Sequence, residues 1–131
     1  MLRLDPTCFV RVFLGLFFLC FMGCSEHLSK EKLAGKYVLS VSDGTDAIEL
    51  KIDGTYTHSF QDKKGAQDTH TGTWQLQTLD AGLTVILDGF RPLMGEQIQG
   101  EGFYLLPIKS SFGKITLITN LDTNEGYERQ R

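Results

Sequence analysis

The stretch AIELKIDGTYTHSFQ, residues 47–61, decides the fold because two alternating segments flank one tight turn. Asp53-Gly54 occupies the turn, and glycine readily supplies the positive φ that a two-residue hairpin turn requires. On either side of the turn, apolar, aromatic or histidine side chains occupy every second position, which is the period of a strand with one buried face. The stretch therefore predicts a hairpin of strands 47–53 and 55–61 with these inward side chains: Ile48, Leu50, Ile52, Tyr56, His58 and Phe60.

Working outward from this hairpin, similar short segments are separated by turn signals rich in Gly, Asp and Ser. They predict further strands over 37–42, 68–77, 83–88, 102–108, 114–121 and 127–131. The side chains predicted to face inward are Tyr37, Leu39, Val41, Trp74, Leu76, Leu83, Val85, Leu87, Ile115, Leu117 and Leu121. The segment 102–108 is apolar on both faces, so its orientation stays open.

Eight sequential strands with mostly short connections favour an antiparallel meander. Closing the sheet removes its two exposed edges. Eight strands is also the number at which a barrel interior is filled by side chains or by one small ligand. We therefore predict an all-β fold, a small up-and-down eight-stranded barrel following an N-terminal signal helix. An open sandwich is the alternative.

The first 23 residues have the pattern of a signal peptide. Arg3 and Arg11 precede an uncharged apolar run from Val12 to Met22. This run is shorter than the about 20 residues that a membrane-spanning helix needs. It falls within the about 7 to 15 residues of a signal-peptide core. We therefore predict that 1–23 is removed from the mature protein.

The segment Phe21-Met22-Gly23-Cys24 resembles the lipobox of bacterial lipoproteins. The resemblance implies that Cys24 carries lipid such as palmitate and becomes the mature N-terminus. Residues 24–36 would then be a polar tether, within which Ser29 is placed to cap one helical turn over 29–33. Ser25 after the cysteine resembles the sorting pattern for the outer membrane, which implies a domain in the bacterial cell envelope facing the periplasm. An uncleaved short anchor and a secretory signal cut elsewhere stay open as alternatives.

Charge and cysteine content exclude several functions. The formal net charge is −3 and no basic stripe is visible, which argues against a nucleic-acid partner. Cys8 and Cys20 would leave with the signal peptide, so a lipidated Cys24 leaves no thiol for a disulfide, a zinc site or a nucleophile. Gly-x-Ser-x-Gly, His-Glu-x-x-His and phosphate-loop motifs are absent. We therefore predict a non-catalytic protein without a cofactor.

Residues 33–131 resemble the lipocalin-like, calycin-type barrels of bacterial envelope lipoproteins. Gly35-Lys36-Tyr37 lies where lipocalins carry Gly-x-Trp at the first strand, and Arg129 lies in the last strand, where that superfamily places an arginine over the aromatic ring. The segments 53–56 and 72–74 also recur in such domains. The resemblance implies that 37–131 is a barrel domain able to bind a small apolar or amphipathic ligand. Copper-responsive members carry a Cys-x-x-Cys that this chain lacks, so no metal site is implied.

His58 and His70 are the candidate polar pair inside the barrel. If their hairpin is centred on Lys64, the two residues stand directly opposite, with Cβ atoms roughly 5 Å apart. Two neutral imidazoles at that spacing could hold a metal or line a polar pocket, and Asp68 is the candidate third ligand. The alternative is two histidines near a barrel mouth that bind water or backbone.

Apolar side chains also occur in the segment 89–100, which otherwise reads as a loop. Phe90, Leu93 and Met94 would form a lid over the barrel, a patch for a partner, or a plug on the core. Trp74 is either core or a platform for a ligand. We therefore predict a lipid-anchored envelope domain that binds a small ligand in its barrel. The alternative is a structural or interaction module that docks an envelope protein through 89–100.

Overall fold

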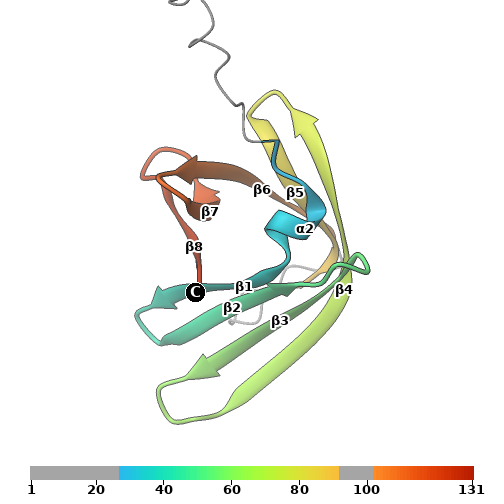
Figure 1. Ribbon diagram of the computed structural model, residues 1–131. Helices are drawn as coiled ribbons and strands as arrows, with labels where there is room; N and C mark the ends of the chain where they lie inside the picture. The colour runs from blue at the N-terminus through green and yellow to red at the C-terminus, as the bar shows by residue number, and fades with distance from the viewer. Residues whose placement is uncertain (1–26, 92–101) are drawn as a thin grey trace, which may run out of the picture.

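The computed structural model describes residues 27–91 and 102–131, and these form a closed barrel of antiparallel strands. Each strand pairs with its neighbours in the chain, and the first strand also pairs with the last (Figure 1). The elements are α2 (Lys30–Leu33), β1 (Gly35–Val41), β2 (Gly44–Leu50), β3 (Thr55–Asp62), β4 (Gln67–Leu79), β5 (Gly82–Phe90), β6 (Gly102–Ser111), β7 (Lys114–Asn120) and β8 (Glu125–Arg129). The predicted up-and-down eight-stranded barrel is confirmed, and the open sandwich is wrong. The predicted signal helix lies outside the described residues.

The central hairpin forms as predicted, but its turn is longer. Leu50 in β2 pairs with Tyr56 in β3, and Lys51 N donates to Thr55 O across 2.9 Å to close the turn. The predicted inward position of Ile52 is therefore wrong, because this residue lies in the turn and its side chain is 64% exposed. The strand alternation stops where the ladder of hydrogen bonds stops.

Two other strand ends differ from the sequence prediction. β2 begins at Gly44, so Asp46 belongs to a strand and not to a turn. β5 extends to Phe90, past a register shift between Leu87 and Phe90. These shifts bring Asp46 and Phe90 to the barrel wall, where the sequence analysis placed loops.

The last strands also differ. A bulge between Ile118 and Asn120 ends β7, and Leu121 beyond it is 64% exposed, so its predicted inward position is wrong. The open question about the orientation of β6 is also resolved. Leu106 faces inward and is fully buried, whereas Leu105 beside it is 50% exposed on the outer wall.

α2 closes one end of the barrel, called here the α2 end. Ser29 caps the helix as predicted, since its Oγ accepts from Lys32 N at 3.4 Å. Leu33 is fully buried in the core, and the Tyr37 hydroxyl donates to its carbonyl across 2.7 Å. The predicted tether over 24–36 is therefore too long, because residues from 30 onward pack against or belong to the barrel.

Arg129 in β8 fastens α2 to the barrel. Its guanidinium donates to Lys32 O at 2.6 Å and to Ala34 O at 2.8 Å, the carbonyls at the end of the helix. A Cβ atom at Gly35 would lie 3.1 Å from Arg129 Nε, so glycine leaves the space for this approach. Burial raises the pKa of Tyr37 to about 12, and the nearby Arg129 charge opposes part of that rise.

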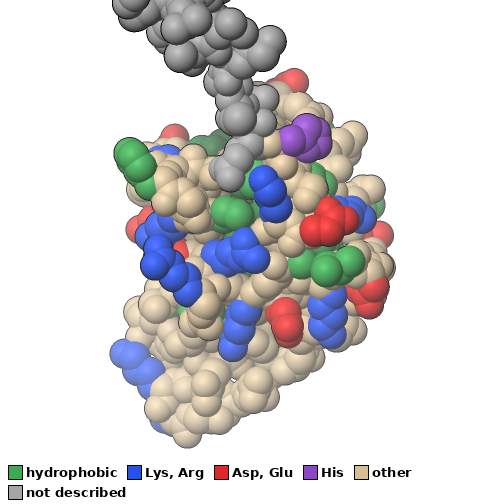
Figure 2. Space-filling view, viewed as in Figure 1, with side chains coloured by type: hydrophobic (Ala, Val, Ile, Leu, Met, Phe, Trp, Pro, Cys, Tyr) green, Lys and Arg blue, Asp and Glu red, His purple; other side chains and the backbone are tan. Residues whose placement is uncertain are grey.

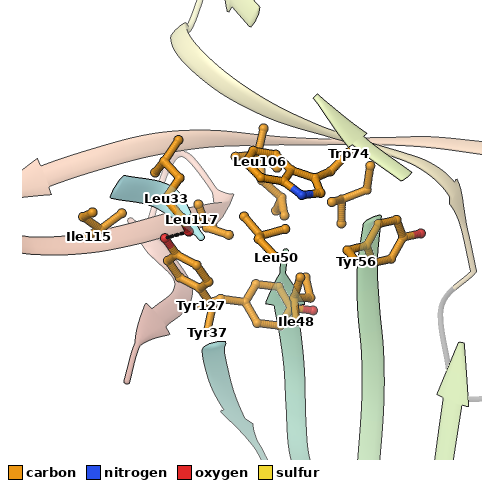
Figure 3. Close-up of a cluster of buried hydrophobic side chains, with 12 residues drawn as sticks. Leu33, Tyr37, Ile48, Leu50, Tyr56, Trp74, Leu106, Ile115, Leu117 and Tyr127 are labelled. Atoms are coloured by element: carbon orange, nitrogen blue, oxygen red, sulfur yellow. Dashed lines mark hydrogen bonds between the residues drawn. The ribbon is translucent and has the colours of Figure 1, made fainter. Parts of the chain in front are cut away.

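The hydrophobic core lies toward the α2 end (Figure 3). Trp74 is 3% exposed there, and its Nε1 donates to Lys51 O across 2.8 Å. Lys30 Nζ lies 5.3 Å from the centre of the Trp74 ring. The β2–β3 turn and α2 therefore both contact this one side chain. The core residues are Leu33, Tyr37, Ile48, Leu50, Tyr56, Trp74, Val85, Leu87, Leu106, Ile115, Leu117 and Tyr127.

Within residues 27–91 and 102–131, no helix is both long and apolar enough to cross a membrane.

The inward faces can be tested with neighbouring substitutions. Leu50→Ala and Leu117→Ala should each lower the free energy of unfolding by about 2 to 5 kcal/mol, because truncation leaves a cavity in a packed core. Glu49→Ala, at an exposed position next to Leu50, should change it by less than about 0.5 kcal/mol. Urea melts of the three variants beside the wild type measure these differences. Equal losses at positions 49 and 50 would contradict the assignment of faces.

Candidate functional site

His58 and His70 face each other inside the barrel, as predicted. They are a register pair of β3 and β4, and their side chains are 1% and 7% exposed. The turn between these strands is held by Asp62 Oδ1, which accepts from Lys64 N and Ala66 N at 2.8 Å each. This turn sets the register and thereby places both imidazoles on the inner face.

His58 belongs to a chain of hydrogen bonds that crosses the barrel. Its Nε2 lies 2.6 Å from Asp46 Oδ1, and the Tyr127 hydroxyl donates to Asp46 Oδ2 across 2.8 Å. An ionised carboxylate only accepts hydrogen bonds, so His58 Nε2 carries a proton and donates. In the neutral ring, the other nitrogen, Nδ1, then carries a lone pair.

Asp46 is the member of this hydrogen-bond network that was not among the candidates from the sequence. The sequence predicts a turn at Asp46 and names Asp68 as the acidic neighbour of the histidines. Asp68 is instead exposed, and its carboxylate accepts from Thr69 N at 2.8 Å. The signal was present, because Asp46 continues the alternation of Ile48 and Leu50 by one more step.

Two tyrosines border the Asp46 carboxylate. Burial raises the pKa of the Tyr127 hydroxyl, and the charge of Asp46 and the hydrogen bond to it raise that pKa further. Burial and the same charge also raise the pKa of Tyr104. Both hydroxyls therefore stay protonated at neutral pH, and Tyr127 serves as a permanent donor to Asp46.

His58 Nδ1 is buried and has no hydrogen-bond partner among the described residues. The ring itself stacks on Phe90 with centroids 4.6 Å apart and an interplanar angle of 25°. Phe90 stacks in turn on Tyr104, at 4.4 Å and 17°. An unsatisfied acceptor thus lies at one end of a stack of three flat rings. We call His58, Phe90 and Tyr104 the ring stack.

His70 belongs to a separate set of hydrogen bonds. Its Nε2 lies 3.2 Å from the Tyr56 hydroxyl, which donates to Asp88 O at 3.2 Å, and its Nδ1 lies 3.4 Å from Arg91 Nη2. One assignment satisfies all three bonds, a neutral ring with its proton on Nε2. The two histidines are opposite each other but take different partners.

Gly72 leaves the space that the Tyr56 ring occupies. A Cβ atom there would lie 2.6 Å from Tyr56 Cε1 and 2.4 Å from Asp88 O. Any larger residue would therefore push the phenol away from the strand. The second set of hydrogen bonds depends on this glycine.

Trp74, another predicted site residue, falls outside this cluster. Trp74 lies in the core at the α2 end and is bonded to Lys51 O. Cys24, Leu93 and Met94 lie outside the described residues, as does most of the predicted loop 89–100. In the described part of the chain, no three or more His, Cys, Asp or Glu side chains are grouped to hold a metal ion.

Compared with known proteins, the chain matches no protein-family model, no curated protein and no solved structure.

The role of Asp46 can be tested against Asp68. Asp46→Ala should lower the free energy of unfolding by about 2 to 4 kcal/mol, because it removes a charged acceptor and leaves the buried Tyr127 hydroxyl unpaired. Asp68→Ala, at an exposed position of β4, should cost less than about 0.5 kcal/mol. Urea denaturation at neutral pH compares the two. A loss at Asp68 as large as at Asp46 would refute the assigned network.

Proposed function

We propose that the protein is a lipid-anchored domain of the bacterial cell envelope, at the outer membrane and facing the periplasm. Its barrel binds one small amphipathic molecule and acts by binding, without catalysis. We also propose that it belongs with the lipocalin-like envelope lipoproteins. The anchor is the lipid on Cys24 that the lipobox resemblance implies.

The observation that carries the binding proposal is the unpartnered His58 Nδ1. A buried polar atom without a partner costs free energy, and such an atom in a native structure calls for an explanation. A bound molecule that donates a hydrogen bond to it removes that cost. The contact with Asp46 places the proton of a neutral ring on Nε2, which leaves Nδ1 as an acceptor, so the ligand supplies an O–H or N–H group.

The surroundings of that nitrogen favour a flat, largely apolar ligand body. The ring stack offers aromatic surface, and flat rings interact favourably in offset stacks. Small-molecule sites typically combine apolar surface with a few placed polar groups. An aromatic alcohol or amine combines the O–H or N–H donor with the flat apolar ring.

The lipocalin resemblance gains support from contacts at the α2 end. The residues that carry it, Gly35, Tyr37 and Arg129, meet there: Tyr37 is a register pair of Arg129, and Gly35 leaves room for the guanidinium. Fold analogy alone does not define a function, so binding needs its own experiment.

Binding can be tested with 2-naphthol, which combines a hydroxyl donor with a flat apolar ring. The wild type should bind one molecule, followed by the fluorescence of the naphthol. His58→Phe keeps a flat ring but removes the acceptor, and should weaken 2-naphthol binding by about fivefold or more.

Naphthalene, which lacks the hydroxyl, is the matched control ligand and should bind the wild type and His58→Phe equally. No binding of 2-naphthol, or an equal loss for both ligands, would count against the proposal. Native mass spectrometry of the purified protein would then show any resident molecule.

The anchor can be tested separately in a bacterial host. Cys24→Ala should accumulate as an uncleaved precursor without lipid, because the modified thiol is removed. Cys20→Ala is the matched control and should be processed as the wild type, because it leaves with the signal peptide. Labelled palmitate and gel mobility report both steps. Processing of Cys24→Ala to the mature size would exclude the lipobox interpretation.

A further inference from the structure

Two large apolar side chains are exposed at hairpin tips of the α2 end. Phe112, between β6 and β7, is fully exposed, and Ile52, between β2 and β3, is 64% exposed. Phe112 also has a φ of 49°, a left-handed conformation that bulky residues rarely adopt. A small or polar residue would serve this turn better, so the folding of the hairpin does not explain the phenylalanine.

Basic side chains lie around the Phe112 hairpin. Two adjoining hollows of about 220 and 560 Å³ flank it, and both are lined by Gly113, Ile115 and Arg129. Lys32, Lys114 and Arg131 also line one or the other, and no acidic side chain of the described chain does. Figure 2 shows several Lys and Arg side chains on the face that carries α2, with Asp and Glu side chains among them. This basic character contrasts with the net charge of −3 for the whole chain.

Most acidic residues at the α2 end lie on elements other than the β6–β7 hairpin that carries Phe112. Glu31 is on α2, Asp53 is on the β2–β3 tip, and Asp80 follows β4. Glu128 is the exception, because its carboxylate pairs with Lys114 Nζ across 2.7 Å at an exposed position. Exposed pairs of this kind contribute little free energy, so Lys114 remains available to an anion.

The N-terminus of the described chain is at this same end. Residue 27 is three residues after Cys24, a reach of about 11 Å at full extension. A lipid on Cys24 would therefore hold the α2 end close to a bilayer surface. This step rests on the proposed anchor, whereas the apolar tips and the basic hollows do not.

We infer that the α2 end is a membrane-docking face for anionic phospholipid, with Phe112 inserted at the interface and Lys114 and Arg131 beside the lipid phosphates. The β2–β3 and β6–β7 tips lie four strands apart in the ring of eight, so Ile52 and Phe112 contact the surface on opposite sides of the barrel. Apolar insertion together with basic charge is the combination that binds proteins to anionic membrane surfaces. The docked domain then has a defined orientation.

Tryptophan quenching by brominated acyl chains tests the contact in the full chain, reconstituted into vesicles of brominated phosphatidylcholine and phosphatidylglycerol. The wild type has Trp74 as its single tryptophan, which is buried and gives the baseline. Phe112→Trp should lose several times more emission than this baseline. Leu121→Trp, at a position that is also exposed (64%) but lies at the other end of the barrel, should match the wild type.

Quenching of Phe112→Trp no greater than the baseline, or equal quenching at position 121, would overturn the docking face. A second comparison tests the lipid charge. Vesicles of phosphatidylcholine alone, or Lys114→Glu added to Phe112→Trp, should reduce the quenching, and unchanged quenching in both would overturn the anionic-lipid assignment. Processing of Cys24→Ala reports on the anchor by itself, so the two proposals fail in different experiments.

Discussion

The barrel depends on a short seam between its first and last strands. β1 and β2 share seven register pairs, whereas β1 and β8 share only Tyr37↔Arg129 and Val38↔Glu128. The guanidinium of Arg129 extends the seam by binding two carbonyls at the end of α2, and Gln130 N adds a bond to Lys36 O. Without closure, the sheet would expose two edges whose backbone groups could pair with other chains. One arginine therefore joins the sheet edges and the helix that covers the barrel end.

The two halves of the interior have different chemistry. Near α2, the packing is apolar and Trp74 has a backbone partner for its single polar atom. Farther along the same strands, Asp46, His58 and Tyr127 form a buried polar network. Buried polar groups destabilise a core unless they are paired, and here all but one nitrogen of that network is paired. The packed half stabilises the barrel, and the site that we propose for binding lies in the polar half.

The proposals fit one orientation of the domain. With the α2 end on the bilayer, the ring stack lies in the half of the barrel away from the membrane. A ligand would then enter from the aqueous side, while Phe112 and the basic hollows contact lipid. The same closed end that completes the core would serve as the contact with the membrane.

The sequence by itself determined the buried faces of most strands and the pairing of the central strands. Alternation in 47–61 and the Asp-Gly turn predict the hairpin, and the symmetry of 58 and 70 about Lys64 predicts the opposed histidines. These features are local, because a strand's period of two depends only on its own backbone. For the candidate site, this local pattern predicted the opposed positions of His58 and His70 but not the residues that hydrogen-bond to them.

Only the tertiary structure decided where strands end and which atoms pair. Ile52 and Leu121 follow the inward alternation, yet they are exposed because the hydrogen-bonded ladder ends before each. Asp46 reaches His58 because β1 and β3 hold β2 in register beyond the turn that the sequence indicates. Strand ends, bulges and side-chain partners depend on neighbouring strands that are distant in the chain, so local periodicity does not contain them.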